Sequence, residues 1–491
     1  MIPIKNHSKL REKEFLMTTL DQTGAPYRRG WFIVTLLLGT FTMSLSQSAL
    51  STAYPTLMHS FGLSADVIQW LTTGFMLVMC ISMPISPWLL NNLSFPAMFT
   101  LALGMFDLGT LIIVAAPAAW GAAGFGIMMV GRILEAGGVG LLFPSYQTVL
   151  LEITPKDQRA TTMGLAGLVM GSALACGPIV AGILLKMFAW QAVFIFFAVV
   201  ITLVLLVARG GAIRDVLPRR QSELDWCSLV LLLGIIGLML GIDQIGKPGV
   251  AWYWYGSGVL LSLAMLTGFT WRQFHLPQPV LELRVLLNVK YDLAILLTSL
   301  AYVALIVTTI IFPLYYQEVL HLSPFWSGLA LVPGAALLSL LNPLTGRLAD
   351  RLGFQPALML GMGLIAGGWL LAWWQVASGH LLPMIGAAMV IEGGNAFVMM
   401  PAVTLGANAL PDALVAHGTA VITTFRQLIG STGVAVMTLL LTQETQAAVH
   451  RGIALLPAAI GGYRQVCLVM LGLAGLGLLL AFGLREHRAT I

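Results

Sequence analysis

Long apolar stretches recur along the whole chain, and short polar, charged or Gly/Pro-rich segments separate them. Each stretch holds roughly the 20 residues that a helix needs to cross a hydrocarbon core of about 30 Å. The stretches are continuously apolar and do not alternate with polar residues, which favours helices over the strands of a membrane barrel. The pattern predicts fourteen transmembrane helices, at 31–55, 67–90, 96–116, 121–151, 161–185, 189–208, 226–244, 252–271, 291–316, 325–346, 356–376, 381–408, 414–442 and 463–484.

The composition excludes a water-soluble globule. Of the 491 residues, 58% are hydrophobic and only 9% are charged, and the mean hydropathy is +0.90. A soluble domain of this size could not bury so much apolar surface. The first 30 residues are polar and mixed in charge, so we expect no cleaved signal peptide. The four cysteines lack paired or metal-type spacing, which indicates free thiols and no metal site.

The basic residues predict the orientation of the chain. An even number of spans places both termini on one side, and the loops of that side carry 19 of the 25 Lys and Arg residues, against 4 on the other side. The positive-inside rule makes the side with the termini cytoplasmic. The net charge of +5 therefore reflects topology, and no nucleic-acid partner is expected. We expect a multi-pass protein of the plasma or bacterial inner membrane.

Two similar phrases mark an internal repeat. "PISPWLLNNLS" begins at Pro84, and "PLTGRLADRLG" begins at Pro343. A glutamate follows each phrase, Glu135 after 51 residues and Glu392 after 49, and a further proline comes 9 residues after each glutamate. Because the registers agree, the second predicted helix corresponds to the tenth, and the fourth corresponds to the twelfth.

The repeat predicts the domain organisation: an all-α membrane protein of two homologous six-helix bundles with two inserted helices. Parallel halves of this kind are one architecture of alternating-access transporters, whose substrate cavity lies between the halves. The predicted segments are a cytoplasmic N-terminal arm (1–30), the first bundle (31–208), a cytoplasmic linker (209–225), the inserted helices (226–271), a second cytoplasmic linker (272–290), the second bundle (291–484) and a cytoplasmic tail (485–491).

Several motifs resemble one family. "GRLADRLG" at Gly346–Gly353 resembles the loop signature of the major facilitator superfamily, and "GRILEAGGVG" at Gly131–Gly140 resembles its fourth-helix motif. "GSALACGPIVAG" at Gly171–Gly182 is similar to the Gly-Pro motif of its antiporters. Together with fourteen predicted spans, these motifs most resemble the fourteen-helix drug:proton antiporter branch. The resemblance implies a non-enzymatic transporter that exchanges protons for lipophilic small molecules, without a cofactor.

The motifs supply candidate residues for a conformational gate. In the second phrase, a carboxylate and two arginines can hydrogen-bond to neighbouring helix ends at the predicted cytoplasmic end of a span. A glycine-proline pair lets a helix bend or pack closely. The alternative for the charged turn is that it only satisfies the positive-inside rule. The candidate gate residues are Gly346, Arg347, Asp350, Arg351, Gly353, Arg132, Gly177 and Pro178.

The first phrase lacks these charges. Pro87 stands at the glycine position, and Asn91, Asn92 and Ser94 replace the aspartate, arginine and final glycine. A charge-assisted hydrogen bond is roughly twice as strong as a neutral one, so the charged second copy should dominate the gate.

Three carboxyl groups are candidates for proton coupling: Glu392, Glu135 and Asp107 lie near the middle of predicted spans. A charge there costs at least about 2.5–3.5 kcal/mol, so each needs a use or a partner. Glu135 lies one turn from Arg132, and a structural ion pair is the alternative. Glu392 has no cation on its own helix, although Arg426 on the next span is a possible partner. For Asp107, structural hydrogen bonding is as reasonable as coupling.

The first span departs from the branch, because "LSQSALSTAYP" has Ser46 and Ser51 where related proteins commonly carry Asp and Asn. This departure weakens the case for strongly cationic substrates. Met and aromatic side chains can accept varied apolar ligands, although on membrane helices they more often serve packing. The candidate cavity residues are Met128, Met129, Tyr315, Tyr316, Phe397, Met399, Met400, Phe425 and Arg426.

The sequence therefore predicts a monomeric, proton-coupled antiporter that exports amphipathic drugs or toxic small molecules. Two alternatives stay open. One is a transporter of a defined metabolite or lipid with different coupling. The other is a non-transporting membrane receptor or enzyme, although the chain shows no nucleotide loop, metal cluster or nucleophile elbow and its loops are short.

Overall fold

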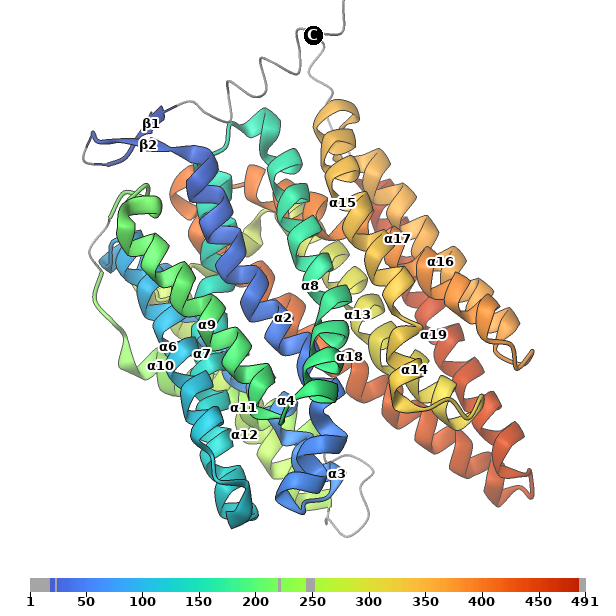
Figure 1. The fold of residues 1–491 in the computed structure, drawn as a ribbon. Coiled ribbons are helices and arrows are strands. Elements are labelled where there is room, and N and C mark those ends of the chain that lie inside the picture. The colour runs from blue at the N-terminus through green and yellow to red at the C-terminus, as the bar shows by residue number, and fades with distance from the viewer. Residues whose placement is uncertain (1–17, 23, 220–221, 244–251, 485–491) are drawn as a thin grey trace, which may run out of the picture.

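The chain folds as a bundle of long, roughly aligned helices (Figure 1). The computed structural model describes residues 18–22, 24–219, 222–243 and 252–484. The longer helices of the first part are α2 (Arg29–Phe61), α4 (Trp70–Ser82), α6 (Phe95–Ala115), α7 (Ala122–Glu152), α8 (Arg159–Met187) and α9 (Gln191–Val207). Those of the last part are α13 (Val289–Glu318), α15 (Val332–Leu352), α16 (Phe354–Gln375), α17 (Leu381–Asn408), α18 (Val415–His450) and α19 (Leu455–Gly483).

Further elements connect or accompany these helices. They are β1 (Thr18–Leu20), β2 (Pro26–Arg28), α3 (Ala65–Ile68), η1 (Met83–Ile85), α5 (Ser86–Asn92), η2 (Ala118–Trp120), η3 (Lys156–Gln158), η4 (Ala208–Ala212), α10 (Trp226–Leu232), α11 (Gly234–Asp243), α12 (Trp252–His275), η5 (Leu283–Leu287), α14 (Pro324–Leu329) and η6 (Asp412–Leu414). The two strands pair antiparallel, with Thr18 opposite Arg28. The N-terminal arm thus contains a hairpin that the all-α prediction missed.

The number of spans differs from the prediction. Within the described residues, twelve helical segments are long and apolar enough to cross a membrane. The predicted stretches at 226–244 and 252–271 also form helices, but α10 and α11 are short, and α12 begins with the less apolar sequence "WYWYG". Fourteen spans are therefore not confirmed. The predicted break after residue 442 is also wrong, because α18 continues to His450 and α19 already begins at Leu455.

Prolines explain where two predicted spans are interrupted. Pro84 and Pro87 occupy first-turn positions of η1 and α5, so the second span is divided into short helices. A proline is favoured at that position because it has no N–H to donate and its backbone angle suits a helix start. Pro333 begins α15 in the same way, and separates it from α14.

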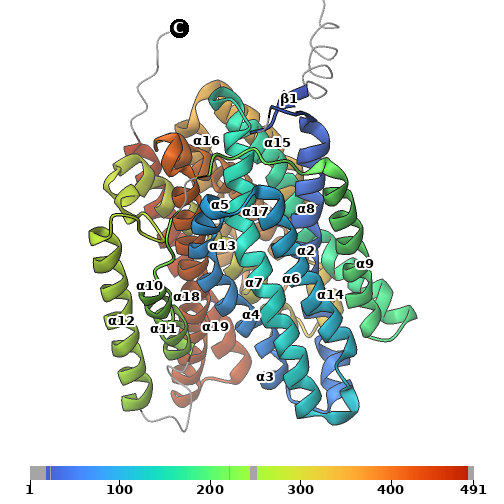
Figure 2. The same cartoon turned by 90° about the vertical axis from the view of Figure 1, so that its left-hand side faces the viewer.

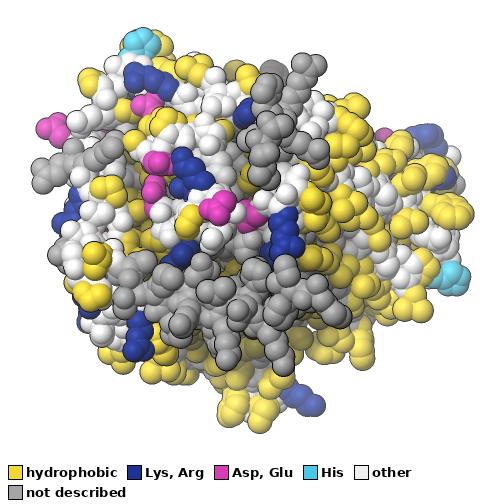
Figure 3. Space-filling view, turned by 90° about the horizontal axis from the view of Figure 1, so that it is seen from above, with side chains coloured by type: hydrophobic (Ala, Val, Ile, Leu, Met, Phe, Trp, Pro, Cys, Tyr) yellow, Lys and Arg dark blue, Asp and Glu magenta, His cyan; other side chains and the backbone are white. Residues whose placement is uncertain are grey.

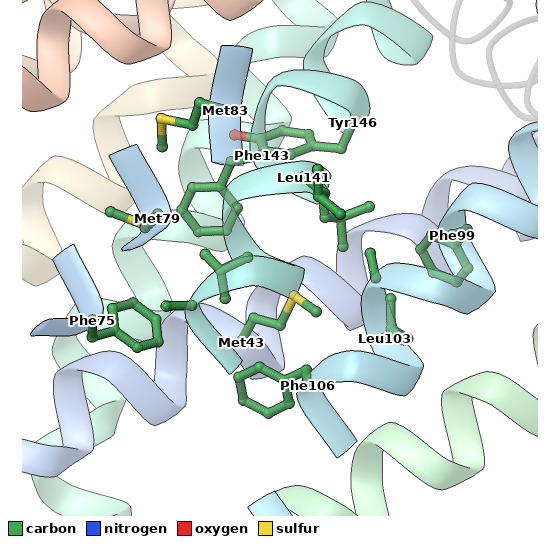
Figure 4. Packing of buried hydrophobic residues seen from close by; sticks show 14 of the residues in the cluster. Met43, Phe75, Met79, Met83, Phe99, Leu103, Phe106, Leu141, Phe143 and Tyr146 are labelled. Atoms are coloured by element: carbon green, nitrogen blue, oxygen red, sulfur yellow. The ribbon is translucent and has the colours of Figure 1, made fainter. Parts of the chain in front are cut away.

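The helices form two packed groups. In the N-terminal group, α2 to α9, the helices α2, α4, α6 and α8 all contact α7. In the C-terminal group, α13 to α19, the helices α13, α15 and α16 contact α17. Figure 2 shows α10 to α12 beside this bundle, and α11 contacts both α4 and α18. One hydrophobic core fills the N-terminal group and continues into residues of α13, α17 and α18, and Figure 4 shows part of it, with Met43, Phe75, Phe106 and Phe143 among its members. A second core lies within the C-terminal group.

The β1–β2 hairpin and the last turn of α19 lie at one end of the bundle, called here the hairpin end (Figure 1). Hydrogen bonds connect its segments: Gln22 N donates to the Asp215 carbonyl, and the Arg29 guanidinium donates to Thr154 Oγ1 at 2.9 Å. Figure 3 shows charged side chains of both signs in the central part of this face. The predicted loops with most of the basic residues therefore meet at this end.

Candidate functional site

The two helix groups meet at the hairpin end where α15 ends against the start of α8. Gly346 makes this approach possible, because a Cβ atom there would collide with the backbone carbonyl group of Ala160. Gly353 ends α15 with φ +92°, a left-handed conformation that favours glycine. Two glycines of the charged phrase thus fix where the helix ends and how closely it approaches the other group.

Asp350 forms the polar part of this contact. Its Oδ1 accepts a hydrogen bond from Ala160 N at 3.1 Å, and its Oδ2 accepts from Thr161 N at 2.7 Å and Thr161 Oγ1 at 2.5 Å. These donors lie in the first turn of α8, whose N–H groups lack helical partners and carry partial positive charge. One carboxylate of the C-terminal group therefore caps a helix of the N-terminal group.

The two arginines of the phrase do not share this role. Arg347 and Arg351 have exposed side chains, and no ion pair links either to Asp350 in the part of the chain that the structure describes. Asp350 uses its oxygens on the other helix group.

The neutral first copy contacts a different part of the chain. Asn92 Nδ2 donates to Ser222 Oγ at 3.0 Å, and Asn92 Oδ1 accepts from Ser222 N at 3.3 Å. Trp88 Nε1 donates to the Ser222 carbonyl at 3.0 Å, while Ser94 caps α6. An amide side chain can accept and donate at once, which suits a contact with a peptide group. The first phrase therefore holds the segment that leads into α10.

A second polar contact between the groups was not predicted from the sequence. Lys156 Nζ lies 3.1 Å from Asp412 Oδ1, and Arg159 Nη1 donates to Asn408 Oδ1 at 3.0 Å. The loops that carry these residues are equivalent in the repeat, and each follows a proline. Their opposite charges were the signal available in the sequence, but charge alone does not show which loops meet.

The Gly-Pro motif of α8 packs against α2. A Cβ at Gly177 would overlap the Ser48 side chain, and it would lie 2.9 Å from Ala49 N. Ser48 Oγ donates to the Ala173 carbonyl at 2.8 Å. Pro178 lies inside α8, which continues to Met187. Within this group, the motif serves close helix packing next to the surface that faces α15.

Glu135 is part of a satisfied cluster in the core of the N-terminal group. It forms an ion pair with Arg132 and accepts a hydrogen bond from Thr110 Oγ1 at 2.7 Å. The Arg132 guanidinium lies 4.2 Å from the Phe75 ring centroid and donates to the Leu71 carbonyl. Both charges are fully buried and face each other. This arrangement fits the structural alternative.

Asp107 lies away from the contact between the groups. Its Oδ2 accepts a hydrogen bond from Thr202 Oγ1 at 2.9 Å, which joins α6 to α9. Its Oδ1 is buried and has no hydrogen-bond partner among the described residues, so the contact satisfies one of the two oxygens and leaves both alternatives for Asp107 open.

Glu392 differs from both. It lies on α17 with 5% exposure, and its Oε2 has no hydrogen-bond partner among the described residues. Its Cγ lies 3.1 Å from the position of a Cβ at Gly334, so the side chain packs against α15. No ion pair joins it to Arg426 in the described structure, so the possible partner on the next helix is not used. Ser46 of α2, where the branch commonly has an acid, is buried without a hydrogen-bond partner, whereas the Ser51 side chain lies outside the described residues.

The predicted cavity residues divide between two environments. Met128 is in the core of the N-terminal group, while Tyr315 and Tyr316 are in the core of the C-terminal group, where Tyr315 donates to the Val376 carbonyl at 2.9 Å. In the described conformation these three side chains pack within their own group, and their role in a substrate cavity stays a prediction.

The other predicted cavity residues contact helices of their own group or residues of the other helix group. Met129 packs at Gly74, and Phe397 packs at Gly361, each within its own group. Met400 lies beside Gly167 of α8, so it reaches the other group. Met399 packs against a small apolar cluster that Leu174 of α8 also contacts, and Phe425 packs against a cluster with members from both groups. The Arg426 guanidinium lies 5.1 Å from the ring centroid of Tyr302 on α13.

Comparisons with known proteins agree with this geometry. Residues 36–434 match the model of the Major Facilitator Superfamily. The chain is 34% identical to the uncharacterized MFS-type transporter YcnB of Bacillus subtilis, over 96% of this chain and 97% of that protein. It is 32% identical to the lincomycin resistance protein LmrB of Listeria monocytogenes, over 82% of this chain and 84% of that protein.

A solved structure shows the same fold. The proton:xylose symporter XylE, bound to 6-bromo-6-deoxy-D-glucose, superposes with a TM-score of 0.65 at 12% identity, over 92% of this chain and 95% of that chain. The family match, the relatives and the helical architecture identify a multi-pass membrane transporter. The chain belongs to the major facilitator superfamily.

Proposed function

We propose that the protein is a proton-coupled antiporter that exports amphipathic drugs or other toxic small molecules by alternating access. The similarity to a protein named for lincomycin resistance supports drug export. Glu392 is the observation that carries the coupling: a buried carboxyl group whose Oε2 has no partner among the described residues can take up and release a proton without breaking an ion pair. Protons, lipophilic substrates and the bilayer are the proposed partners of a monomer that needs no cofactor.

The contact at the hairpin end supplies the gate. By the positive-inside rule, the basic residues of the loops support a cytoplasmic position for this end. Asp350 and the Lys156–Asp412 pair hold the two groups together there, so the described conformation is closed toward the cytoplasm. Opening to the cytoplasm requires the α8 N-terminus to leave Asp350.

The fourteen-helix branch remains part of this proposal. The helices α10 with α11, and α12, are the two inserted spans, and they stand beside α4 and α18 (Figure 2). Arg272 of α12 links them at the hairpin end, because its Nε and Nη2 donate hydrogen bonds to the two carboxylate oxygens of Asp225, the residue before α10, at 2.6 and 2.9 Å. The two inserted spans can then move together, as one unit, when the helix groups move.

Transport by proteoliposomes tests the function. Purified protein is reconstituted, a pH gradient is imposed, and uptake of lincomycin, ethidium and fluorescein is followed together with internal pH. A proton that moves down a gradient of one pH unit releases about 1.4 kcal/mol, which should drive accumulation against the substrate gradient. Wild-type protein without gradient-driven uptake of any substrate in a broader panel of lipophilic drugs would remove the proposal.

Glu392→Gln tests the coupling site. The amide keeps the size of the side chain but carries no exchangeable charge, so substrate binding should persist while uphill transport is lost. Asp107→Asn is the matched control, because that carboxyl group is already hydrogen-bonded to α9. Wild-type accumulation by Glu392→Gln, with a loss in Asp107→Asn, would move the coupling site to Asp107.

A further inference from the structure

Arg426 is a buried cation between the two helix groups. It lies 11 residues into α18, or about 16 Å along a helix that rises 1.5 Å per residue, which is near the middle of a bilayer. The side chain is 8% exposed, and its Nε and Nη1 have no hydrogen-bond partner among the described residues. A guanidinium in this position is costly unless an anion or an acceptor meets it.

The groups around Arg426 come from both halves. Its guanidinium lies 5.1 Å from the ring centroid of Tyr302 on α13, and the Tyr302 hydroxyl donates to Gln427 Oε1 at 2.8 Å. From the N-terminal group, Leu174 of α8 packs against the same apolar cluster as Tyr302, and α7, which carries Tyr146, contacts α18. The neighbouring Gln147 has a buried Oε1 without a partner in the described structure.

Figure 4 shows Tyr146 beside Phe143 and Met83, with their rings and sulfur in one packed cluster. The Phe143 and Tyr146 rings meet edge to face with centroids 6.1 Å apart. In the C-terminal group, Tyr302 packs against a small apolar cluster that includes Leu305 of α13, and Leu174 of α8 packs against the same cluster. The unpaired charge is therefore surrounded by aromatic and aliphatic surface from both groups.

No acidic side chain of the described chain forms an ion pair with Arg426, and Glu392 packs instead against α15. The cation–π contact with Tyr302 leaves Nε and Nη1 available. A guanidinium offers donors in a planar fork that matches a carboxylate. The missing acceptor is therefore of a kind that a bound molecule can provide.

We infer that Arg426 binds the anionic group, such as a carboxylate, of an amphipathic substrate whose apolar body lies against the cluster around Tyr302 and Leu174. The inference rests on the proposed export function and adds the charge class of the substrate. Because Tyr146 and Leu174 belong to one group and Arg426 to the other, movement of the groups would dismantle the site and release the ligand.

Binding of two related dyes tests the inference. Fluorescein and rhodamine 123 share a xanthene ring system, but the first carries a carboxylate and the second is a cation. Their affinities for the purified full-length protein are measured by fluorescence polarisation, without any pH gradient. We expect wild-type protein to bind fluorescein at least about tenfold more tightly, the smallest effect expected for a hydrogen bond to a charged group.

The variants separate recognition from folding. Arg426→Gln should weaken fluorescein binding at least about tenfold and leave rhodamine 123 unchanged, and Arg426→Lys should give an intermediate loss. Arg464→Gln is the matched control, because Arg464 also stacks on an aromatic ring, 4.4 Å from Trp373, but is exposed. If Arg426→Gln does not fold, Arg426→Lys and the wild-type dye preference still decide the question.

Absence of saturable fluorescein binding to wild-type protein, a preference for rhodamine 123, or equal weakening of both dyes by Arg426→Lys would overturn the inference. The outcome is separable from that of the proposed function. Arg426-dependent fluorescein binding without gradient-driven transport would refute proton-coupled export alone, and gradient-driven transport without such binding would refute the anion site alone.

Discussion

Replacement of Asp350 by asparagine should open the contact at the hairpin end. Asparagine keeps one acceptor oxygen, but its NH₂ group would face the N–H and hydroxyl donors of Thr161 that Oδ2 now accepts. A hydrogen bond to a charged group contributes about 1.5–3 kcal/mol. The bond from Thr161 N is lost, and the Thr161 hydroxyl can only accept a weaker, neutral bond from the new NH₂ group, so the two changes together cost about 3 kcal/mol. At about 1.4 kcal/mol per factor of ten, the closed state should lose about 100-fold in population relative to the open state.

Maleimide labelling in detergent measures this shift. Thr419 is buried at the contact, where its hydroxyl lies 2.5 Å from that of Thr148 in the other group. A cysteine at position 419 should therefore react only when the groups separate, and Asp350→Asn should accelerate its labelling up to about 100-fold. Asn91→Ala in the neutral phrase should change the rate far less. Equal rates in wild-type and Asp350→Asn proteins, at equal folded amounts, would refute this account of the gate.

Three further predictions concern stability. Glu135→Gln leaves the buried Arg132 charge unpaired, so the free energy of unfolding should fall by about 3–5 kcal/mol and the thermal midpoint should drop. An unchanged midpoint with lost transport would instead assign Glu135 to proton coupling. Gly177→Ala should lower the free energy of unfolding by about 1–3 kcal/mol, because the new methyl group would force α8 away from α2. Gly182→Ala is the control and should be neutral, because its new methyl group would meet its nearest neighbour at 3.6 Å. Equal thermal midpoints of the two variants would contradict this account of the packing. Hydrogen bonds from Arg272 lower the pKa of Asp225 from 3.8 to about 2. The stability that these bonds give the folded protein should therefore be present above pH 3.8 and vanish as the pH falls towards about 2. The midpoint difference between wild-type and Asp225→Asn proteins should shrink over that range, and a difference independent of pH would exclude the charge as its cause.

The sequence predicted those parts of the site that local spacing controls. Glu135 and Arg132 are three residues apart, which puts them on one helix face, and their pairing follows from helix geometry alone. The repeat identified Asp350 and Glu392 as residues of interest, because equivalent positions could be compared within one chain. The opposite charges of the loops around Lys156 and Asp412 were visible too, but nothing local indicated that the loops touch.

The sequence by itself determined that the chain crosses a membrane repeatedly, that its halves are related, and that one copy of the repeated phrase is charged. The reason is that hydrophobic length, repeat register and residue type are local properties. The tertiary structure decided that Asp350 caps α8, that Asn92 holds the segment before α10, and that Tyr315 lies in the core of its own group while Arg426 stacks on the Tyr302 ring. Membrane helices are apolar on most sides, so their pattern does not distinguish a face toward lipid, toward the same group or toward the other group. Only the packing of helices distant in the sequence makes that distinction.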